Sequence, residues 1–324
     1  MFVEKQVRIK MTVSVVIPVY NGALSIERLV ANVKSSLQDK LQEIILVNDC
    51  SSDNSEQICL SIAQTNPEVS FVSLRKNFGE HNAIMCGLSF ATGDYVAIID
   101  DDFQNPPQEI LKLLDVAESG YDVVFSRYSE KKHAWWRNLG SSINNLVASF
   151  VLKKPKSLYL SSFKLIKNDV VKEILKYKGP FPYIDGLILR VTRNIGTCLV
   201  EHSSREHGRS NYTFSKLLSL YLKMFLNFSV LPLRVFTVFG FFVFLLGVVL
   251  CTWFILERLL FPTNVPLGWA SLIVAVITFS GVQVMFLGLI GEYLGKIHLD
   301  LNGTPQWVIK SKALSAKNRL TGIF

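Results

Sequence analysis

Residues 94–107 read DYVAIIDDDFQNPP, a short apolar run that ends in three consecutive aspartates. A continuous apolar run of this length, bounded by polar residues, is typical of a strand buried on both faces. Pro106 and Pro107 end the segment, because proline donates no backbone hydrogen bond. We therefore predict a buried strand whose carboxyl end carries a cluster of carboxylates.

The chain around this segment alternates between apolar strands and amphipathic helices. The predicted strands are 13–19, 43–47, 69–74, 95–99 and 122–126. The predicted helices are 26–37, 57–63, 81–91 and 108–118. This alternation predicts an α/β fold, a mostly parallel sheet with helices on both faces, whose ligands bind at the carboxyl ends of the strands.

Polar residues follow three of the predicted strands. They are Tyr20 and Asn21, then Asn48 and Asp49, then the three aspartates 100–102. Because the carboxyl ends of parallel strands meet at one edge of a sheet, we expect these residues to lie together. No GxGxxG follows the first strand and no GxxxxGK[ST] occurs, so neither a Rossmann dinucleotide site nor a P-loop is predicted.

Three adjacent aspartates repel one another and raise one another's pKa unless a cation neutralises them. Side chains alternate in direction along an extended chain, so Asp100 and Asp102 can point to the same side. Carboxylate oxygens suit Mg²⁺ or Mn²⁺, which also bind phosphate. The alternative is a solvated acidic loop, but the buried strand before it and the prolines after it favour a metal site.

Composition and charge are unevenly distributed along the 324 residues. The chain is 49% hydrophobic and 19% charged, with a mean hydropathy of +0.31, which excludes a disordered chain and a disulfide scaffold. Residues 153–234 hold 15 Lys and Arg against 5 Asp and Glu, which indicates anionic lipid or phosphate rather than nucleic acid, with a solvated basic face as the alternative. The five cysteines have no paired spacing, which fits a reducing, cytoplasmic setting.

Two long uncharged segments lie toward the end of the chain. Residues 235–256 would form about 33 Å of helix, enough for a hydrocarbon core of about 30 Å, and a second run covers 265–291. We predict a two-helix transmembrane hairpin; the alternative is a buried helix pair of a soluble protein. Lys and Arg flank the hairpin on its terminal sides, so both termini are predicted to be cytoplasmic. The N-terminal apolar stretch is too short for a signal peptide.

Six motifs extend over nearly the whole chain, from about residue 13 to 307. They are VVIPVYNG (15–22), VNDCSSD (47–53), NFGEHNAIMCG (77–87), DDDFQNPP (100–107), FSVLPLR (228–234) and GEYLGKI (291–297). Together they resemble the polyprenyl-phosphate glycosyltransferases of glycosyltransferase family 2, which have the A-type fold and include bacterial undecaprenyl-phosphate glucosyl- and aminoarabinosyltransferases. The acidic segment combined with the C-terminal hairpin and GEYLGKI is the most specific part of this resemblance.

The resemblance implies an inverting, metal-dependent transfer of a sugar from a nucleotide diphosphate sugar, with UDP expected, to a polyprenyl phosphate such as undecaprenyl phosphate. The implied ligands of Mg²⁺ or Mn²⁺ are Asp100, Asp102 and Gln104. The implied nucleotide-sugar contacts are Pro18, Tyr20, Asp49 and Asp101. The implied catalytic residues are Asp100, Asp102, Arg127 and Arg205. The implied acceptor-phosphate contacts are Arg205, Arg209 and Ser210.

Three positions depart from the family pattern. Asn211 stands where the family has Lys, and Arg209 is expected to replace that phosphate contact. Gly22 stands where many relatives have Glu. Ser162 stands where some relatives have an Asp proposed as catalytic base. An acceptor phosphate with a second pKa of about 6 is already largely dianionic and needs no base; a nearby carboxylate such as Asp101 or Asp185 is the alternative.

These features predict a chain of four parts in the inner membrane. They are a cytoplasmic nucleotide-sugar-binding catalytic domain (1–211), an interfacial juxtamembrane helix (212–234), the transmembrane hairpin (235–291) and a cytoplasmic C-terminal tail (292–324). The stretches 135–152 and 212–228 are predicted to lie at the membrane interface, with packing on the sheet as the alternative. The expected partners are a nucleotide sugar, a polyprenyl phosphate lipid and the membrane, but no nucleic acid; a homo-oligomer is left open.

Two rival functions remain at the level of the sequence. A processive polysaccharide synthase would need more spans and a Gln-x-x-Arg-Trp motif, whereas Gln306 and Trp307 lie beyond the second uncharged run. A non-enzymatic membrane assembly partner that binds nucleotide would not need the intact acidic segment.

Overall fold

The computed structural model describes residues 11–128, 158–201, 231–260 and 268–315, and the chain separates into two units. Met1–Asn211 and Thr304–Phe324 form the first unit, and Tyr212–Gly303 form the second. The predicted interfacial stretches 135–152 and 212–228 lie outside the described residues.

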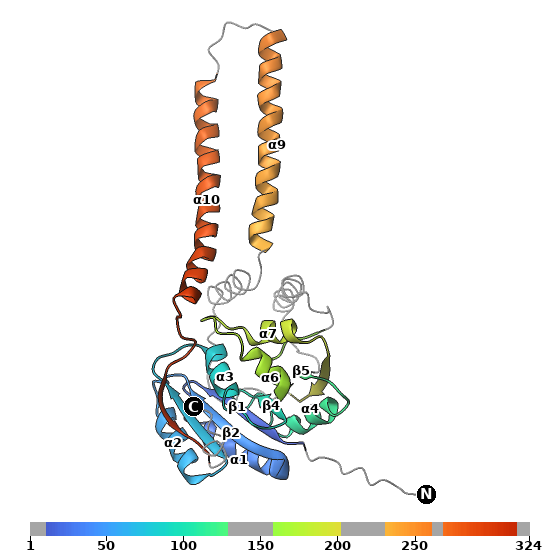
Figure 1. Cartoon of the computed structure of the whole chain (residues 1–324), viewed down its shortest axis with the longest axis vertical. Helices are drawn as coiled ribbons and strands as arrows, with labels where there is room; N and C mark the ends of the chain where they lie inside the picture. The colour runs from blue at the N-terminus through green and yellow to red at the C-terminus, as the bar shows by residue number, and fades with distance from the viewer. Residues whose placement is uncertain (1–10, 129–157, 202–230, 261–267, 316–324) are drawn as a thin grey trace, which may run out of the picture. The chain divides into compact units, whose positions relative to one another are not determined.

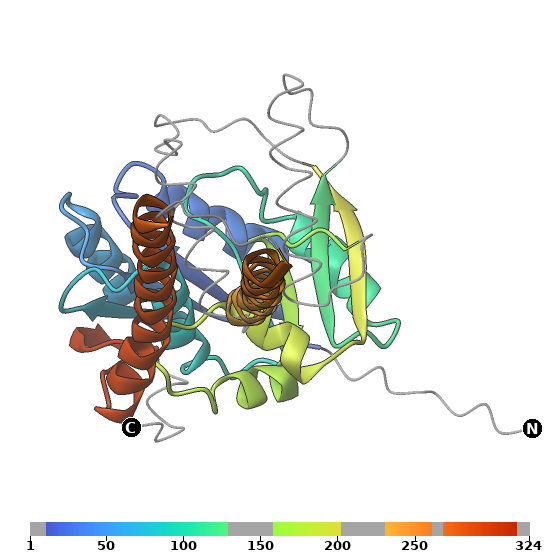
Figure 2. The ribbon, with the colours of Figure 1, turned by 90° about the horizontal axis from the view of Figure 1, so that it is seen from above.

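An eight-stranded sheet organises the first unit, in the order β7-β5-β6-β4-β1-β2-β3-β8. The strands are β1 (Val13–Val19), β2 (Leu41–Asn48), β3 (Val69–Leu74), β4 (Tyr95–Ile98), β5 (Val123–Tyr128), β6 (Lys164–Lys167), β7 (Ile195–Val200) and β8 (Ile309–Ala313). Strands β4, β1, β2 and β3 run parallel to one another, and β5 runs parallel to β7. Figure 2 shows β5 and β7, green and yellow, side by side at one edge. The mostly parallel sheet is therefore confirmed.

Helices cover both faces of this sheet, as the alternating pattern predicted (Figure 1). They are α1 (Ile26–Leu37), α2 (Ser55–Thr65), α3 (Glu80–Leu88), α4 (Glu109–Ala117), α6 (Asn168–Ile174) and α7 (Ile184–Val191), with a short 3₁₀ helix η1 (Gln38–Lys40) after α1. One apolar layer contains side chains of α1, α2 and α4, and the other contains side chains of α3, α6 and α7. Neighbouring strand residues alternate between these layers, because Val15 faces the first and Val16 the second. The central strands β1, β2, β3 and β4 are thus buried on both faces, whereas β7 and β8 carry exposed residues.

Two strands that the sequence did not predict run antiparallel to their neighbours. Strand β6 lies between β4 and β5 and pairs antiparallel with both. Strand β8 comes from the end of the chain and pairs antiparallel with β3, where Phe71 faces Ala313. In addition, the Gln306 side-chain amide donates to the carbonyls of Tyr177 at 3.0 Å and Gly179 at 2.7 Å. The C-terminal residues therefore form part of the sheet domain.

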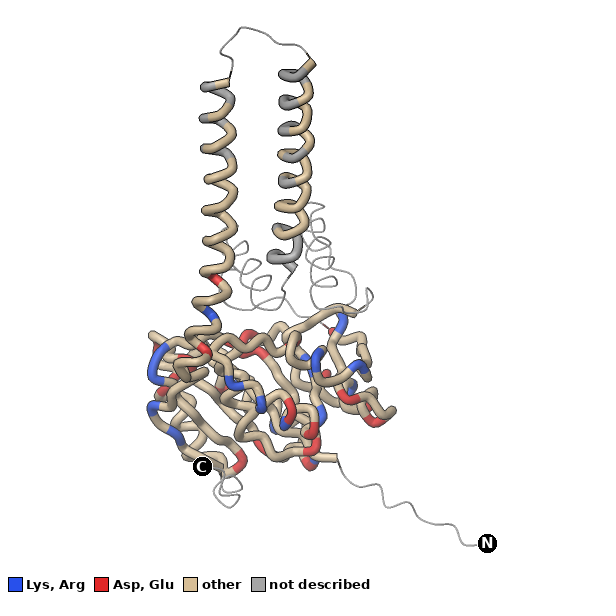
Figure 3. Tube along the Cα trace, turned by 45° about the horizontal axis from the view of Figure 1, so that its top comes forward, with Lys and Arg blue, Asp and Glu red and all other residues tan. Residues whose placement is uncertain are grey.

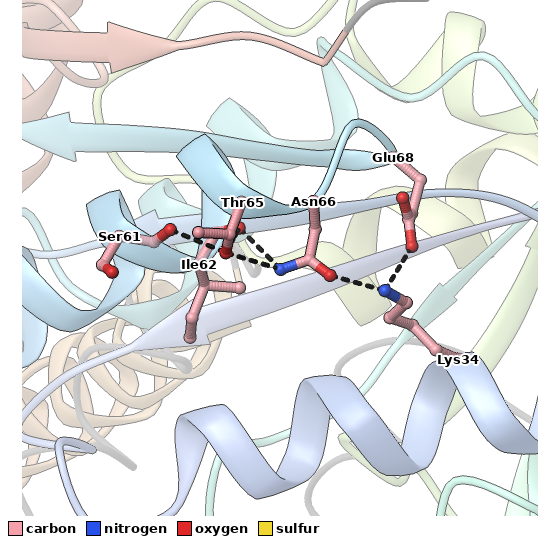
Figure 4. A network of polar contacts seen from close by, with 6 residues as sticks. All are labelled: Lys34, Ser61, Ile62, Thr65, Asn66 and Glu68. Carbon is pink, nitrogen blue, oxygen red and sulfur yellow. Dashed lines mark hydrogen bonds and ion pairs between the residues drawn. The ribbon is translucent and has the colours of Figure 1, made fainter.

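A polar network at the C-terminal end of α2 connects this helix to α1 (Figure 4). The Ile62 carbonyl near the end of α2 accepts from the Asn66 backbone amide at 3.0 Å and also from the Asn66 side-chain amide at 2.8 Å. The Lys34 ammonium donates to the Asn66 side chain and forms an ion pair with Glu68 at 2.7 Å. This network lies between α1 and the start of β3.

The second unit contains two long helices, α9 (Leu231–Leu260) and α10 (Trp269–Leu301), which lie side by side in Figures 1 and 3. A Cβ atom at Gly240 of α9 would lie 3.4 Å from the Phe286 ring of α10, so this side chain packs against the glycine. Large apolar side chains on both helices are exposed, including Phe242 at 62% and Leu287 at 67%. Among the residues that the structure describes, no helix is long and apolar enough to cross a membrane.

Candidate active site

Left-handed backbone conformations mark the carboxyl ends of the three central strands. Among the described residues, four that are not glycine have positive φ: Asn21 (58°), Gln38 (44°), Cys50 (55°) and Phe103 (60°). Asn21 closely follows β1, Cys50 follows β2 and Phe103 follows β4, which are neighbouring strands. Such conformations cost free energy for residues with a Cβ and concentrate at functional sites. The predicted gathering of these three strand ends is confirmed.

Hydrogen bonds hold the loops after β1 and β2 together. The Asn21 side-chain oxygen accepts from the Ser52 amide at 2.9 Å, and the Asn21 amide donates to the Ser51 hydroxyl at 3.0 Å. The Gly22 amide donates to the Ser55 hydroxyl at 3.0 Å. These contacts fix the loop that carries Tyr20, whose side chain is 54% exposed. Tyr20 is therefore available to a ligand at this edge.

Asp49 is almost completely buried at the end of β2. Its two carboxylate oxygens accept from the backbone amides of Phe78 at 2.7 Å and Gly79 at 2.8 Å, just before α3. Burial raises the pKa of Asp49, and the two amide hydrogen bonds oppose that shift. The residue predicted to contact the nucleotide thus also positions the start of α3, a contact that the sequence pattern does not reveal.

We define residues 100–105 as the acidic loop; each of its three aspartates has a different hydrogen-bond donor. The Ser162 hydroxyl donates to Asp100 Oδ2 at 2.6 Å. The Tyr20 amide donates to Asp101 Oδ2 at 3.3 Å, and the Gln104 amide donates to Asp102 Oδ1 at 3.1 Å. Hydrogen bonds therefore join the acidic loop to the end of β1 and to the segment before β6, and a third hydrogen bond lies within the loop.

Gly22 lies close to this loop. A Cβ atom at residue 22 would lie 2.3 Å from Asp101 Oδ2, so a side chain there would require the Asp101 carboxylate to rotate.

The acidic loop offers oxygen ligands of the kind that Mg²⁺ or Mn²⁺ prefers. The predicted ligands are two carboxylates, Asp100 and Asp102, and the side-chain amide of Gln104. Within the part of the chain that the structure describes, no group of three or more His, Cys, Asp or Glu is arranged to hold a metal ion. Magnesium sites commonly use one or two carboxylates together with substrate phosphates. The residues present fit a cation shared with a bound diphosphate.

A buried charged cluster adjoins the acidic loop. Lys164 of β6 forms an ion pair with Asp185 of α7, and both residues are buried. Glu80 at the start of α3 keeps an exposed surface, yet desolvation by the surrounding protein raises the pKa of its carboxyl to about 7. Nearby Asp100 adds to this shift and Lys164 opposes it. Burial lowers the pKa of the neighbouring His81 to about 4, so this imidazole is neutral at physiological pH.

Sequence reasoning missed most of this cluster. Glu80 lies within a quoted motif and Lys164 close to Ser162, but the sequence pattern assigns neither a role, and only Asp185 is expected as an alternative base. The members come from α3, β6 and α7, so no local spacing connects them. Lys164 begins the four-residue strand β6 (KLIK), which has a lysine at each end, so the local sequence carries no signal that this lysine has a buried partner.

Of the predicted arginines, the structure describes Arg127 alone. Arg127 is exposed near the end of β5, where its backbone pairs with Leu199 of β7. Arg205, Arg209, Ser210 and Asn211 lie outside the described residues. Pro18 lies in β1 opposite Val47 of β2, at the strand ends that converge on the site.

Comparisons with known proteins agree with this fold. The sequence model of glycosyl transferase family 2 matches residues 14–175, and that of the GtrB C-terminal hairpin matches residues 231–297. The chain is 35% identical over 303 residues to undecaprenyl-phosphate 4-deoxy-4-formamido-L-arabinose transferase of Edwardsiella ictaluri (strain 93-146), covering 92% of this chain and 93% of the relative. The protein of that name in Pseudomonas syringae pv. syringae (strain B728a) is 33% identical over 307 residues, covering 92% and 90%.

A solved structure shares the fold at lower sequence identity. Glucosyl-3-phosphoglycerate synthase from Mycobacterium tuberculosis, in complex with Mn²⁺, uridine diphosphate and glucosyl-3-phosphoglycerate, superposes with a TM-score of 0.50 and 19% identity. The match covers 67% of this chain and 78% of that one. The family match, the full-length relatives and the shared fold lead to one conclusion: the chain belongs to glycosyl transferase family 2 and is a glycosyltransferase.

Proposed function

We propose that this enzyme transfers a sugar from a nucleotide diphosphate sugar, with UDP as the nucleotide, to undecaprenyl phosphate or a closely related polyprenyl phosphate. The observation that carries the proposal is the acidic loop at the end of β4, in a chain that matches undecaprenyl-phosphate sugar transferases over 92% of its length. The reaction inverts the configuration at the anomeric carbon and takes place at the cytoplasmic face of the inner membrane.

The donor occupies the edge formed by β4, β1 and β2. Asp100, Asp102 and Gln104 would hold Mg²⁺ or Mn²⁺, which would neutralise the charge of the departing diphosphate. Pro18, Tyr20, Asp49 and Asp101 contact the nucleotide sugar, and exposed Tyr20 is suited to stack on a base. A precedent for the donor and the metal is the neighbour of the same fold that contains Mn²⁺ and uridine diphosphate.

The acceptor phosphate approaches from the basic part of the chain. Arg127, Arg205, Arg209 and Ser210 contact phosphate oxygens, for which the arginine side chain is well suited. The acceptor is already largely a dianion at neutral pH, so no side chain has to remove a proton before attack. This proposal agrees with a serine at position 162, whose hydroxyl donates to Asp100 instead of acting as a base.

From the sequence, we propose that the uncharged segments 235–256 and 265–291 insert into the membrane as a hairpin. Residues 235–256 carry no charge, and large apolar side chains of α9 and α10 are exposed, among them Val249 at 62% and Leu272 at 63%. An apolar surface of this kind is stable in lipid rather than in water. We propose the layout of catalytic domain (1–211), interfacial helix (212–234) and hairpin (235–291), with both termini in the cytoplasm. Of the predicted C-terminal tail (292–324), residues up to Leu301 continue α10, and Thr304–Phe324 group with the catalytic domain.

The direct test is a transfer assay with purified full-length protein, undecaprenyl phosphate and a panel of radiolabelled UDP-, GDP- and dTDP-sugars. We expect one labelled lipid product from one UDP-sugar, and loss of transfer in excess EDTA. Product from a GDP- or dTDP-sugar alone would overturn the choice of nucleotide. Nucleotide binding without transfer from any donor would favour the non-enzymatic alternative, and a polymeric product would favour the synthase.

A further inference from the structure

Two adjacent serines connect to the two ends of the acidic loop, Ser162 directly and Ser161 through Tyr128. At its first residue, the Ser162 hydroxyl donates to Asp100 Oδ2 at 2.6 Å. At its last residue, the Tyr128 hydroxyl donates to Asn105 Oδ1 at 2.7 Å and lies 3.0 Å from the Ser161 hydroxyl. We refer to Ser161 and Ser162 as the serine pair.

The Ser161 contact belongs to a chain of hydroxyl groups with a defined direction. The Ser126 hydroxyl of β5 donates to Ser161 Oγ at 2.7 Å. Because the Tyr128 proton is directed to Asn105, the Ser161 hydroxyl donates in turn to the Tyr128 oxygen. This chain of hydrogen bonds, which we call the relay, therefore runs from Ser126 through Ser161 and Tyr128 to Asn105.

Three of these four groups are shielded from water, and the fourth, Tyr128, is half-buried. Ser126 is fully buried, and Ser161 and Asn105 are each 3% exposed. Hydrogen bonds in a connected, buried network fix side-chain orientation more firmly than the same bonds at a surface. The end of the acidic loop at Asn105 is thus held rigidly against β5.

We propose that the serine pair sets the geometry of the metal-binding carboxylates, with Ser162 acting as a positioning residue through Asp100. The inference rests on the proposed metal-dependent function. Groups that hydrogen-bond to metal ligands orient those ligands, and their removal typically weakens metal affinity. Ser162 restricts rotation of the Asp100 carboxylate, while the relay through Ser161 fixes the other end of the loop.

The same geometry explains why a hydroxyl suits position 162. A carboxylate brought to the place of the Ser162 hydroxyl would set a second negative charge directly against Asp100, and like charges at this separation repel strongly. A hydroxyl donates a proton to Asp100 without adding charge. The departure from Asp at this position therefore exchanges a candidate base for a group that orients a metal ligand.

The test measures Mn²⁺ binding directly, by the electron paramagnetic resonance signal of free Mn²⁺, with full-length protein in detergent and UDP present. Ser162→Ala should raise the apparent Kd for Mn²⁺ roughly 10-fold or more. Its kcat at saturating Mn²⁺ should stay close to that of the wild type, because no base is lost. Ser162→Thr keeps the hydroxyl and should restore the affinity, and Ser162→Cys, a weak donor of similar size, should resemble Ser162→Ala.

Two further variants separate positioning from a general loss of packing. Tyr128→Phe removes the donor to Asn105 and should also weaken Mn²⁺ binding, while UDP binding without metal stays unchanged. Ser70→Ala removes a buried hydroxyl on β3 that accepts from the Ser315 amide, and should leave Mn²⁺ affinity unchanged.

The Mn²⁺-binding results separate a failure of the proposed metal site from a failure of the role of the serine pair. If the wild type binds no Mn²⁺ in the presence of UDP, the proposed metal site is wrong. If the wild type binds Mn²⁺ and Ser162→Ala binds it equally well, the role of the serine pair is wrong. A large loss of kcat at saturating Mn²⁺ in Ser162→Ala, with metal affinity unchanged, would likewise overturn it and would assign Ser162 to the chemical step.

Discussion

The aspartates of the acidic loop differ in the elements that hold them. Asp101 accepts from the Tyr20 amide and faces the Gly22 backbone, so it connects the loop to β1. Asp102 accepts from the Gln104 amide, a donor within the loop itself. Substitution of Asp102 should therefore disturb the fold less than substitution of Asp101.

Asp102→Asn should abolish metal-dependent transfer while the protein remains folded. In the proposed metal site this change would remove one ligand charge near the departing diphosphate, and removal of a single electrostatic stabiliser commonly lowers kcat on the order of 10²- to 10³-fold. The measurement is radiolabel transfer to undecaprenyl phosphate, with circular dichroism as the check on folding. Asp115→Asn, on the exposed face of α4, is the matched control and should keep full activity. Full activity of Asp102→Asn would remove the acidic loop from the metal site.

Glu80 should make stability depend on pH in the absence of metal. Its pKa in the folded protein is about 7, above the ordinary value of 4.5, so the folded state binds this proton more tightly than the unfolded state. The contribution to stability is present below about pH 4.5 and is lost as the pH rises through about 7.

Glu80→Gln should therefore flatten the dependence between about pH 5 and about pH 8, because the titrating group is gone. The measurement is denaturant unfolding of wild type and variant in EDTA at both pH values. Glu80→Asp, which keeps a carboxylate, should retain the wild-type slope. A Glu80→Gln slope equal to that of the wild type would show that Glu80 is already ionised at the lower pH.

At the scale of elements, β8 depends on contacts with distant parts of the chain. Its register with β3 joins residues more than 200 positions apart, and a Lys310–Glu56 ion pair at 3.0 Å connects it to α2. That ion pair is partly exposed and is expected to contribute little. Buried Gln306, which donates to two carbonyls near α6, is the stronger attachment.

Gln306→Ala should loosen β8 without unfolding the rest of the sheet. The buried Gly179 carbonyl and the partly buried Tyr177 carbonyl lose their donor, at a cost of about 1–3 kcal/mol. If β8 opens locally, this cost corresponds to roughly 5- to 150-fold faster amide exchange. Hydrogen–deuterium exchange of residues 304–315 measures it, and Gln64→Ala on the exposed side of α2 is the control. Exchange as slow as in the wild type would mean that strand pairing alone holds β8.

At the scale of the whole molecule, chemical labelling of the native thiols can test the proposed orientation in the membrane. Cys50 is exposed in the catalytic domain, whereas Cys59, Cys86 and Cys198 are buried. Burial raises the pKa of Cys59 and Cys86 to about 12, so these thiols react slowly. Cys50 is therefore the natural target of a thiol reagent on this domain.

A membrane-impermeant maleimide should label Cys50 in inverted inner-membrane vesicles and not in intact spheroplasts. The reason is that the catalytic domain is proposed to face the cytoplasm, which the reagent reaches only in inverted vesicles. Mass spectrometry of the labelled protein gives the site, and Cys50→Ser should lose this label. Labelling of Cys50 in intact spheroplasts would reverse the proposed orientation.

The sequence by itself determined the elements whose signal is local. Strands β1 to β5 and helices α1 to α4 closely match their predicted ranges, because burial on both faces leaves continuous apolar runs and burial on one face leaves helical spacing. The same local reasoning placed Asp100 and Asp102 at the end of β4 and brought the ends of β1, β2 and β4 together.

Only the tertiary structure decided which distant segments pair. Strand β8 reads IKSKA, with three exposed residues and no apolar run, so its place beside β3 leaves no local pattern. The Lys164–Asp185 ion pair, the two amides that hold Asp49 and the Ser162 contact with Asp100 each join separate elements. Hydrophobic periodicity records whether a residue is buried, but the partner of a buried polar group is set by chain topology, and that appears only when the sheet is assembled.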